Sequence, residues 1–273
     1  MTPDQTGAHL QSAHRIRCEW GPTGAAAVTA DVAVVVDVLS FTTTLTVAAA
    51  RGIEVFPYPW RDGGAAQHAL RHGATLAVGR FEALTRTDRR HVSLSPASLA
   101  RADDVERLVL PSPNGSSIAF ALRDSGAEVV GASLRNASAV AAYLRPVVRA
   151  GRSVVLVPAG ERWPDGSLRP AVEDLWGAGA VLAGLEGWGA PGPGEATLSP
   201  EALAAVAAFR AVPSLAEALP ACASGRELVE RGYVDDVALA AEPDVSDVVP
   251  VLVGESFIAV GSAEPATEDP GSR

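Results

Sequence analysis

Lysine is absent from this 273-residue sequence, and all 22 of its basic residues are arginine. Without lysine, the protein cannot form a Schiff base with a substrate or with pyridoxal phosphate. It also cannot contain a phosphate-binding loop that ends in Gly-Lys. Any contact to an anion must therefore come from arginine, from hydroxyl groups or from backbone N–H groups.

Histidine and cysteine are scarce. The five histidines all lie before residue 92, and the two cysteines, Cys18 and Cys222, have no metal or redox spacing. His68 and His72 have the i, i+4 spacing of a metal pair, but no third ligand is evident, so we expect them on an exposed helix face. These absences argue against histidine-based zinc chemistry and against Ser-His catalysis.

Positive charge and long apolar runs are also lacking. The net charge is −10 and the pI is about 5.0, which argues against a general nucleic-acid binder. The longest apolar runs, such as residues 32–36, are far shorter than the roughly 20 residues that cross a bilayer, and no signal-peptide pattern is present. We expect a cytoplasmic protein with reduced thiols that binds no nucleic acid and no membrane. No feature indicates an oligomeric state.

The middle of the chain alternates between short β-branched runs and alanine-rich helical stretches. Strands are predicted at residues 32–36, 54–58, 75–78, 107–110, 128–131 and 153–157. Helices are predicted at residues 44–51, 64–71, 116–125, 137–149 and 172–185. This alternation predicts a three-layer α/β/α fold with a mostly parallel sheet, which binds ligands beyond the carboxyl ends of its strands.

A glycine- and proline-rich stretch at residues 186–200 is predicted to be an excursion loop. Helices at 201–209, 215–221 and 224–231 and strands at 249–253 and 257–260 are expected after it. We assign residues 15–262 to one domain, because the last strands would otherwise have no sheet to join. Residues 1–14 are expected to be flexible and residues 263–273 to form a disordered tail.

The first of these predicted strands ends at a carboxylate that is followed by hydroxyl groups at the start of a helix. Asp37 comes directly after this strand, and the hydroxyl residues are Ser40, Thr42, Thr43 and Thr44. A strand-end carboxylate suits a hard divalent ion, and a hydroxyl-rich helix N-terminus offers donors to a phosphate. The alternative is that Asp37 caps a turn and the threonines cap the helix.

Small donors and further acids follow the later strands. They are Asn114, Gly115, Ser116 and Ser117 after the fourth strand, Ser133 and Asn136 after the fifth, Glu161 after the sixth, and Glu173 and Asp174 in the next helix. Each is ordinary alone, since Ser, Asn and Gly favour turns and acids favour the first turn of a helix. At one edge of a parallel sheet, however, they would converge with Asp37. Several acids among neutral donors are what a magnesium and phosphate site requires.

The sequence does not decide which group is the nucleophile of such a site. Asp37 could attack phosphorus and form an aspartyl phosphate, although Asp37-Val38-Leu39 lacks the Asp-x-Asp signature of that mechanism. The alternative is water activated by the metal or by an acid such as Glu173.

Six short segments carry a resemblance to a known family. They are VVVDVLSFTTT at 34–44, PNGSS at 113–117, GASLRNASAVA at 131–141, VPAGE at 157–161, VEDLWGAGA at 172–180 and SGRELVERGYVDDV at 224–237. In their order and spacing the chain resembles the 2-phosphosulfolactate phosphatase family over about residues 30–255. This family consists of magnesium-dependent phosphatases of coenzyme M biosynthesis with an α/β/α fold.

The resemblance implies magnesium-dependent hydrolysis of a small acidic phosphate monoester, such as 2-phospho-3-sulfolactate, to 3-sulfolactate and phosphate. Asp37 would hold magnesium, with Glu173 or Asp174 as a further ligand or as the base that activates water. Residues 42–44 and 114–117 would cradle the phosphate. The residues expected to contact the rest of the substrate are Arg80, Ser133, Asn136 and Glu161.

The sequence departs from the family at several positions. It has Ser40 where members carry arginine, Gly79-Arg80 where they carry Gly-Glu, Leu94 where they carry asparagine, and Pro158 where they carry cysteine. Loss of an arginine and an asparagine would weaken the binding of a doubly anionic substrate, and Arg80 would restore one positive charge. Two alternatives therefore accompany the phosphatase: a catalytically silent relative that binds a small anion or a protein partner, and an enzyme acting on a phosphate-free substrate.

Overall fold

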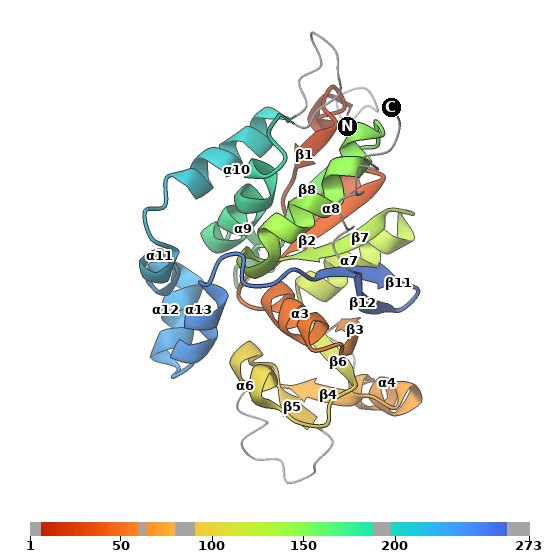
Figure 1. Cartoon of the computed structure of the whole chain (residues 1–273), viewed down its shortest axis with the longest axis vertical. Coiled ribbons are helices and arrows are strands. Elements are labelled where there is room, and N and C mark those ends of the chain that lie inside the picture. The colour runs from red at the N-terminus through yellow and green to blue at the C-terminus, as the bar shows by residue number, and fades with distance from the viewer. Residues whose placement is uncertain (1–6, 60–63, 80–90, 188–197, 261–273) are drawn as a thin grey trace, which may run out of the picture.

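The computed structural model describes residues 7–59, 64–79, 91–187 and 198–260 and shows helices on both sides of one large sheet (Figure 1). The strands of this sheet, in spatial order, are β1 (Ile16–Cys18), β8 (Val154–Pro158), β2 (Val32–Val36), β7 (Glu128–Ala132), β11 (Val249–Val253), β12 (Ser256–Val260), β3 (Glu54–Pro59), β6 (Arg107–Ser112), β4 (Thr75–Val78) and β5 (His91–Ser93). A separate small hairpin consists of β9 (Glu161–Arg162) and β10 (Leu168–Arg169). The predicted three-layer α/β/α fold with a mostly parallel sheet is confirmed.

The sheet is built from two parallel halves joined by an antiparallel hairpin. β1, β8, β2 and β7 run parallel, as do β3, β6, β4 and β5. Between them, β11 and β12 pair antiparallel with each other and with β7 and β3. Because three successive pairings between β7 and β3 are antiparallel, the two halves run in opposite directions. This reversal was not predicted from the sequence.

The junctions of the hairpin are narrow. β11 meets β7 at Val251 and Val130, and β12 meets β3 at Phe257 and Val55. The β3–β6 ladder, in contrast, pairs six residues on each strand. The residues that follow β2 and β6 nevertheless come into contact, although four strands lie between these two strands in the sheet order.

Strand alternation divides the interior into two cores. Val32, Val34 and Val36 of β2 face one core, and Ala33 and Val35 face the other. The first core is closed by α8 (Ala137–Arg149), α9 (Val172–Ala183) and α10 (Pro200–Arg210), and the second by α2 (Gly21–Ala27), α3 (Phe41–Ala50) and α7 (Gly115–Asp124). Because both faces of β2 are buried, its residues are nearly all valine, as in a parallel strand covered by helices.

The structure describes further helices outside these two groups. They are the 3-10 helices η1 (Gly7–Leu10) and η2 (Leu134–Asn136), and the α-helices α4 (Ala65–His72), α6 (Pro96–Arg101), α11 (Leu215–Ala221), α12 (Ala223–Glu230) and α13 (Val234–Ala240). No single helix among the described residues is long and apolar enough to span a bilayer. Only α10 and α11 taken together reach that length and hydropathy, and the chain bends by 106° between them.

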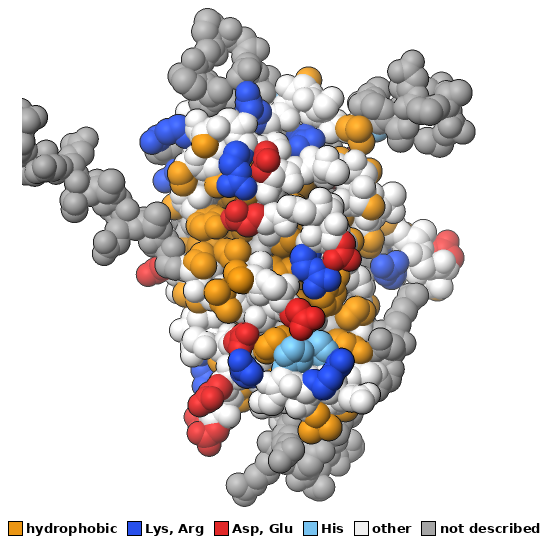
Figure 2. Space-filling view, turned by 90° about the vertical axis from the view of Figure 1, so that its right-hand side faces the viewer, with side chains coloured by type: hydrophobic (Ala, Val, Ile, Leu, Met, Phe, Trp, Pro, Cys, Tyr) orange, Lys and Arg blue, Asp and Glu red, His pale blue; other side chains and the backbone are white. Residues whose placement is uncertain are grey.

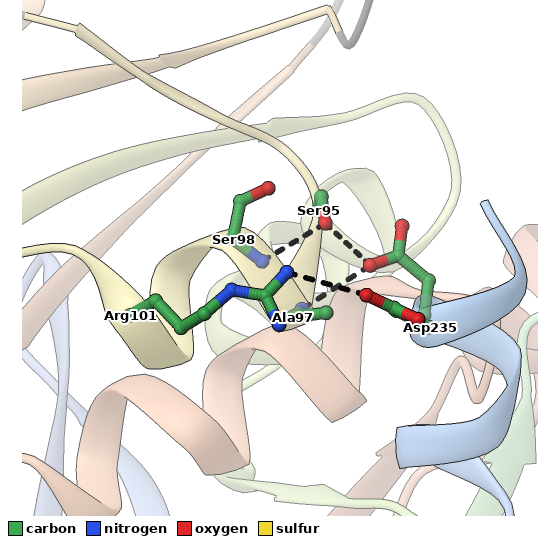
Figure 3. Close-up of polar contacts among 6 residues, drawn as sticks. Ser95, Ala97, Ser98, Arg101 and Asp235 are labelled. Carbon is green, nitrogen blue, oxygen red and sulfur yellow. Dashed lines mark hydrogen bonds and ion pairs between the residues drawn. The ribbon is translucent and has the colours of Figure 1, made fainter. Parts of the chain in front are cut away.

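A buried carboxylate ties α13 to α6. Asp236 is 1% exposed, and its Oδ1 accepts hydrogen bonds from the Ser95 hydroxyl and, at 3.2 Å, from the Ala97 N–H. Figure 3 shows these contacts beside the ion pair of Arg101 with the exposed neighbour Asp235. Ser95 also caps α6 by accepting from the Ser98 N–H at 3.0 Å. The turn that enters α6 is therefore fixed from two sides.

Candidate active site

A pocket of about 230 Å³ lies between the ends of β2 and β6. The residues that line it are Asp37, Leu39, Ser40, Phe41, Thr44, Leu94, Leu110, Pro111, Ser112, Pro113, Asn114 and Glu161. Two of its walls come from the oppositely directed halves of the sheet, and a third comes from the segment after β8. The pocket brings together four predicted site residues from these three strand ends: Asp37, Thr44, Asn114 and Glu161.

Asp37 is held by the first turns of two helices. Its Oδ1 accepts from the Phe41 N–H of α3 at 3.1 Å, and its Oδ2 accepts from the Gly115 N–H of α7 at 3.2 Å. The side chain is 8% exposed, and its burial raises its pKa to about 6. The two N–H bonds oppose this rise, and the negative charge of Glu173 adds to it.

Gly115 is required where α7 approaches Asp37. A Cβ atom at this position would lie 2.2 Å from Phe41 Cδ1 and 2.9 Å from Asp37 Oδ2. The absence of a side chain lets the N-terminus of α7, with its positive dipole end, come within hydrogen-bond distance of the carboxylate.

Glu161 and Asn114 form the opposite side of the pocket. Asn114 Nδ2 donates to Glu161 Oε2 at 3.1 Å. Burial raises the pKa of Glu161 to about 7, helped by the nearby charge of Asp37, whereas the bond from Asn114 and the charge of Arg169 lower it. The pocket therefore contains two carboxyl groups that titrate near neutral pH, as acid-base groups of enzymes do.

Asp174 connects the ends of β2 and β8. Its Oδ1 accepts from the Val38 N–H at 2.7 Å, and its Oδ2 accepts from the Gly160 N–H at 2.9 Å. Each of these N–H groups is next in sequence to a pocket acid, Asp37 or Glu161. Burial raises the pKa of Asp174 well above its ordinary value, with further contributions from the charges of Asp37 and Glu173. In this arrangement Asp174 fixes the backbone of both pocket acids.

Glu173 lies behind the pocket. It is 2% exposed, and its charge raises the pKa values of both Asp37 and Glu161, so it is close to both, although its side chain does not line the pocket. Its side chain is hydrogen-bonded to Cys222, whose thiol has a pKa raised to about 12 by burial and by this neighbour. The thiol is therefore protonated at neutral pH and can donate to the carboxylate.

The threonine hydroxyls at the start of α3 bond to nearby backbone. Thr42 Oγ1 accepts from the Asp37 N–H and donates to the Asp37 carbonyl, and Thr43 Oγ1 donates to the Val38 carbonyl at 2.7 Å. Thr44 Oγ1 donates to the Ser40 carbonyl at 2.8 Å. Of the three, Thr44 lines the pocket, whereas Thr42 and Thr43 are 0% exposed. Their hydroxyls fix the turn between β2 and α3.

Ser133 and Asn136 are fully buried and do not line the pocket. The Asn136 Oδ1 accepts from the Ser133 N–H at 2.8 Å, and Asn136 Nδ2 donates to the Val248 carbonyl at 3.1 Å. Together they form the capping box of η2 and join it to the strand β11 that follows Val248. The serine and asparagine three residues apart at a strand end are the sequence signal for this cap.

The remaining predicted residues are placed as follows. Ser116 is fully buried, and its hydroxyl donates to the Leu110 carbonyl at 3.1 Å. Ser117 is partly exposed in the first turn of α7. Arg80 lies outside the described residues. Ser112, whose hydroxyl accepts from the Gly115 N–H at 3.1 Å, lines the pocket and was not predicted.

The oxygen donors of the pocket suit a hard divalent cation. Among the described residues, no three His, Cys, Asp or Glu side chains converge as a metal site. Mg²⁺, however, takes only one or two protein carboxylates and completes its shell with water and phosphate oxygens. Asp37 and Glu161 offer two carboxylates in one pocket, and their mutual repulsion would be relieved by a cation. The residues therefore fit Mg²⁺.

The histidine pair lies apart from this pocket. The rings of His68 and His72 are 4.4 Å apart on α4, and His72 Nε2 lies 3.6 Å from Glu255 Oε2. Figure 2 shows histidine side chains flanked by arginine and acidic side chains on the surface. The two rings also stack with Phe56 and Tyr58 of β3. They form an aromatic surface cluster.

Two comparisons identify relatives. The sequence pattern of the family described as 2-phosphosulpholactate phosphatase matches residues 23–255. The chain belongs to this family. It is also 32% identical, over 232 residues, to a probable 2-phosphosulfolactate phosphatase of Thermus thermophilus, in a match that covers 84% of this chain and 92% of the relative. Membership in the family makes the chain a phosphatase, a hydrolase of phosphoric monoesters, and confirms the resemblance found in the sequence.

Proposed function

We propose that this chain hydrolyses a small acidic phosphate monoester of the 2-phosphosulfolactate type and that the reaction requires Mg²⁺. The observation that carries the proposal is the meeting of Asp37 and Glu161 in one pocket beside the N-terminus of α7. The substrate class is that in the name of the Thermus thermophilus relative. The cytoplasmic location expected from the sequence stays a prediction.

Asp37 would hold the cation at the end of β2. When bound, Mg²⁺ would offset the charge of the phosphate oxygens and of the leaving alkoxide. The N-terminus of α7 favours an anion at the same place, because its positive dipole end and its first N–H groups lie beside Asp37. Asn114 would position Glu161 through the 3.1 Å bond between their side chains.

Glu161 is the best candidate for proton transfer. Its pKa of about 7 lets it exist in both protonation states at neutral pH, which is the range in which a general base and acid are effective. As water attacks phosphorus and the bond to the ester oxygen breaks, Glu161 would accept the proton of the water. Asp37, with the lower pKa of about 6, would stay ionised.

The test is release of inorganic phosphate from a panel of phosphomonoesters that includes 2-phosphosulfolactate, measured with Mg²⁺ and with a chelator. We expect Mg²⁺-dependent turnover that Asp37→Asn abolishes. Asp103→Asn, which changes an exposed acid that does not line the pocket, is the control and should retain wild-type activity. A flat result across the panel would favour a binding protein for small anions, and equal rates in chelator would refute the cation requirement.

A further inference from the structure

The hairpin formed by β9 and β10 places an arginine beside the pocket. In its antiparallel register, Arg169 lies directly opposite Glu161. Side chains of directly opposed residues point to the same face of a hairpin, with Cβ atoms roughly 5 Å apart. Glu161 lines the pocket and binds Asn114, and Arg169 projects from the same face of the hairpin as Glu161.

The guanidinium of Arg169 is held by neutral groups. Its Nη2 donates to the Ser224 hydroxyl of α12 at 3.1 Å, and its Cζ lies 6.0 Å from the centre of the Trp163 ring. Within the part of the chain that the structure describes, no ion pair of Arg169 is found, and its charge acts on Glu161 across the hairpin. Arg169 is therefore oriented without having its charge neutralised by an ion pair.

The pocket itself supplies no such charge. Its two ionisable lining side chains, Asp37 and Glu161, are both acids, and no arginine occurs among the described residues that line it. A substrate with a carboxylate or sulfonate in addition to its phosphate needs a second cationic contact. The planar fork of an arginine matches such a group with two parallel hydrogen bonds.

We propose that Arg169 binds the non-phosphate acidic group of the substrate, a carboxylate or a sulfonate, at the rim of the pocket and thereby selects acidic phosphomonoesters. This proposal rests on the proposed function for the nature of the substrate. Trp163, which is 53% exposed in the turn of the hairpin, flanks the guanidinium, and Ser224 holds it from the α12 side. Arg169 is thus a specificity-determining residue.

The hairpin contains its own control. Arg162 is next to Glu161 but pairs with Leu168, so its side chain points to the opposite face of the hairpin. It is exposed, and its Nη1 donates to the Gly166 carbonyl at 3.3 Å. Arg162→Gln removes the same charge from the same hairpin without changing the face that meets the pocket.

The kinetic test compares hydrolysis of 2-phosphosulfolactate with hydrolysis of glycerol 2-phosphate, which carries no second acidic group. For Arg169→Gln we expect kcat/KM to fall about 10- to 100-fold more on the acidic ester than on the neutral ester, mainly through KM. Arg169→Lys keeps the charge and should recover part of the loss. Arg162→Gln should match the wild type on both esters.

A binding test separates this proposal from the proposed function. Calorimetric titration with 3-sulfolactate measures recognition of the acidic groups in the absence of turnover. We expect Arg169→Gln to weaken this binding about 10-fold or more, with a melting temperature close to that of Arg162→Gln. Failure of the wild type to hydrolyse any phosphomonoester would refute the proposed function alone. Unchanged 3-sulfolactate binding in Arg169→Gln, absence of binding to the wild type, or equal losses on both esters would overturn the role of Arg169.

Discussion

The backbone N–H of Gly115 donates to Asp37 Oδ2 across 3.2 Å and thereby joins the first turn of α7 to the end of β2. Gly115→Ala would place a Cβ atom 2.2 Å from Phe41 Cδ1 and 2.9 Å from this carboxylate oxygen. We expect the free energy of unfolding to fall by about 1–3 kcal/mol, as for other overpacked sites. Phosphatase activity should fall at least 10-fold, because Asp37 must move.

Urea denaturation and a phosphate-release assay measure both effects. Ala121→Ser, on the exposed side of the same helix, is the control and should leave stability and activity close to those of the wild type. A fully active Gly115→Ala variant would show that the close approach of α7 to Asp37 is not needed for turnover.

Asp174→Ala tests the connection between β2 and β8. It leaves the buried N–H groups of Val38 and Gly160 without their acceptor, which costs about 1–3 kcal/mol for each group. Removal of a buried charge offsets part of this cost, so we expect the free energy of unfolding to fall by a net amount on the order of 2 kcal/mol. The melting temperature should fall even in chelator, since the connection does not depend on a cation.

Asp124→Ala is the control for Asp174→Ala, because Asp124 is an exposed acid whose ion pair with Arg123 is worth little. If Asp174→Ala lost activity but kept the metal-free melting temperature of the wild type, its role would be that of a metal ligand instead.

The pocket acids make stability depend on pH. The pKa of Glu161 is raised from 4.5 to about 7 in the folded chain, so the folded state binds this proton more tightly than the unfolded state. The ionised side chain therefore destabilises the fold above pH 7, and stability is regained as the pH falls from about 7 towards 4.5. Glu161→Gln should stabilise the metal-free protein at pH 8 by on the order of 1–3 kcal/mol.

Thermal melts in chelator at pH 8, 7 and 6 measure this effect. The advantage of Glu161→Gln over the wild type should shrink as the pH falls, and Glu106→Gln, at an exposed acid, should show no such trend. A constant difference across this range would contradict the raised pKa.

Substitution of the two neighbouring aspartates of α13, Asp235 and Asp236, should change stability and KM to different extents. Asp236→Ala removes the buried acceptor of the Ser95 hydroxyl and the Ala97 N–H, and we expect the free energy of unfolding to fall by about 2–4 kcal/mol. Because Ser95 follows the pocket residue Leu94, we also expect a higher KM. Asp235→Ala removes only an exposed ion pair at 3.4 Å, visible in Figure 3, and should cost less than about 1 kcal/mol. Equal effects of the two substitutions, in melting temperature and KM, would contradict the anchoring role of Asp236.

Local patterns in the sequence predicted most of the secondary structure. The helix at 137–149 and the strand at 249–253 match the structure residue for residue, and all eight predicted strands are present. The strands β1 and β5 were missed because three residues are too short to show a period. The short hairpin of β9 and β10 was also missed, although the Asp165-Gly166 pair in its loop is a turn signal.

Long-range pairing could not be read from the sequence. The insertion of β11 and β12 between β7 and β3 reverses half of the sheet, and no local pattern encodes which strands become neighbours. The meeting of Asp37 and Asn114 was predicted from strand ends at one edge, yet the two strands that precede them belong to oppositely directed halves of the sheet.

The direction in which a side chain points also could not be predicted from the sequence, and this limited the prediction of the site. Thr43 and Asn136 are polar residues after strands, as predicted, but their donors bond to backbone carbonyls, which spacing alone does not reveal. Arg169 was missed because its position depends on the hairpin register with Glu161.

The hairpin of β11 and β12 also sets an order for biosynthesis. Every other strand of the large sheet is complete by residue 158, whereas these two begin at residue 249. A nascent chain therefore carries β7 and β3 as open edges until β11 and β12 leave the ribosome, and such edges invite aggregation. Because the pocket draws its walls from both halves, we expect catalytic competence only after β11 and β12 have been synthesised.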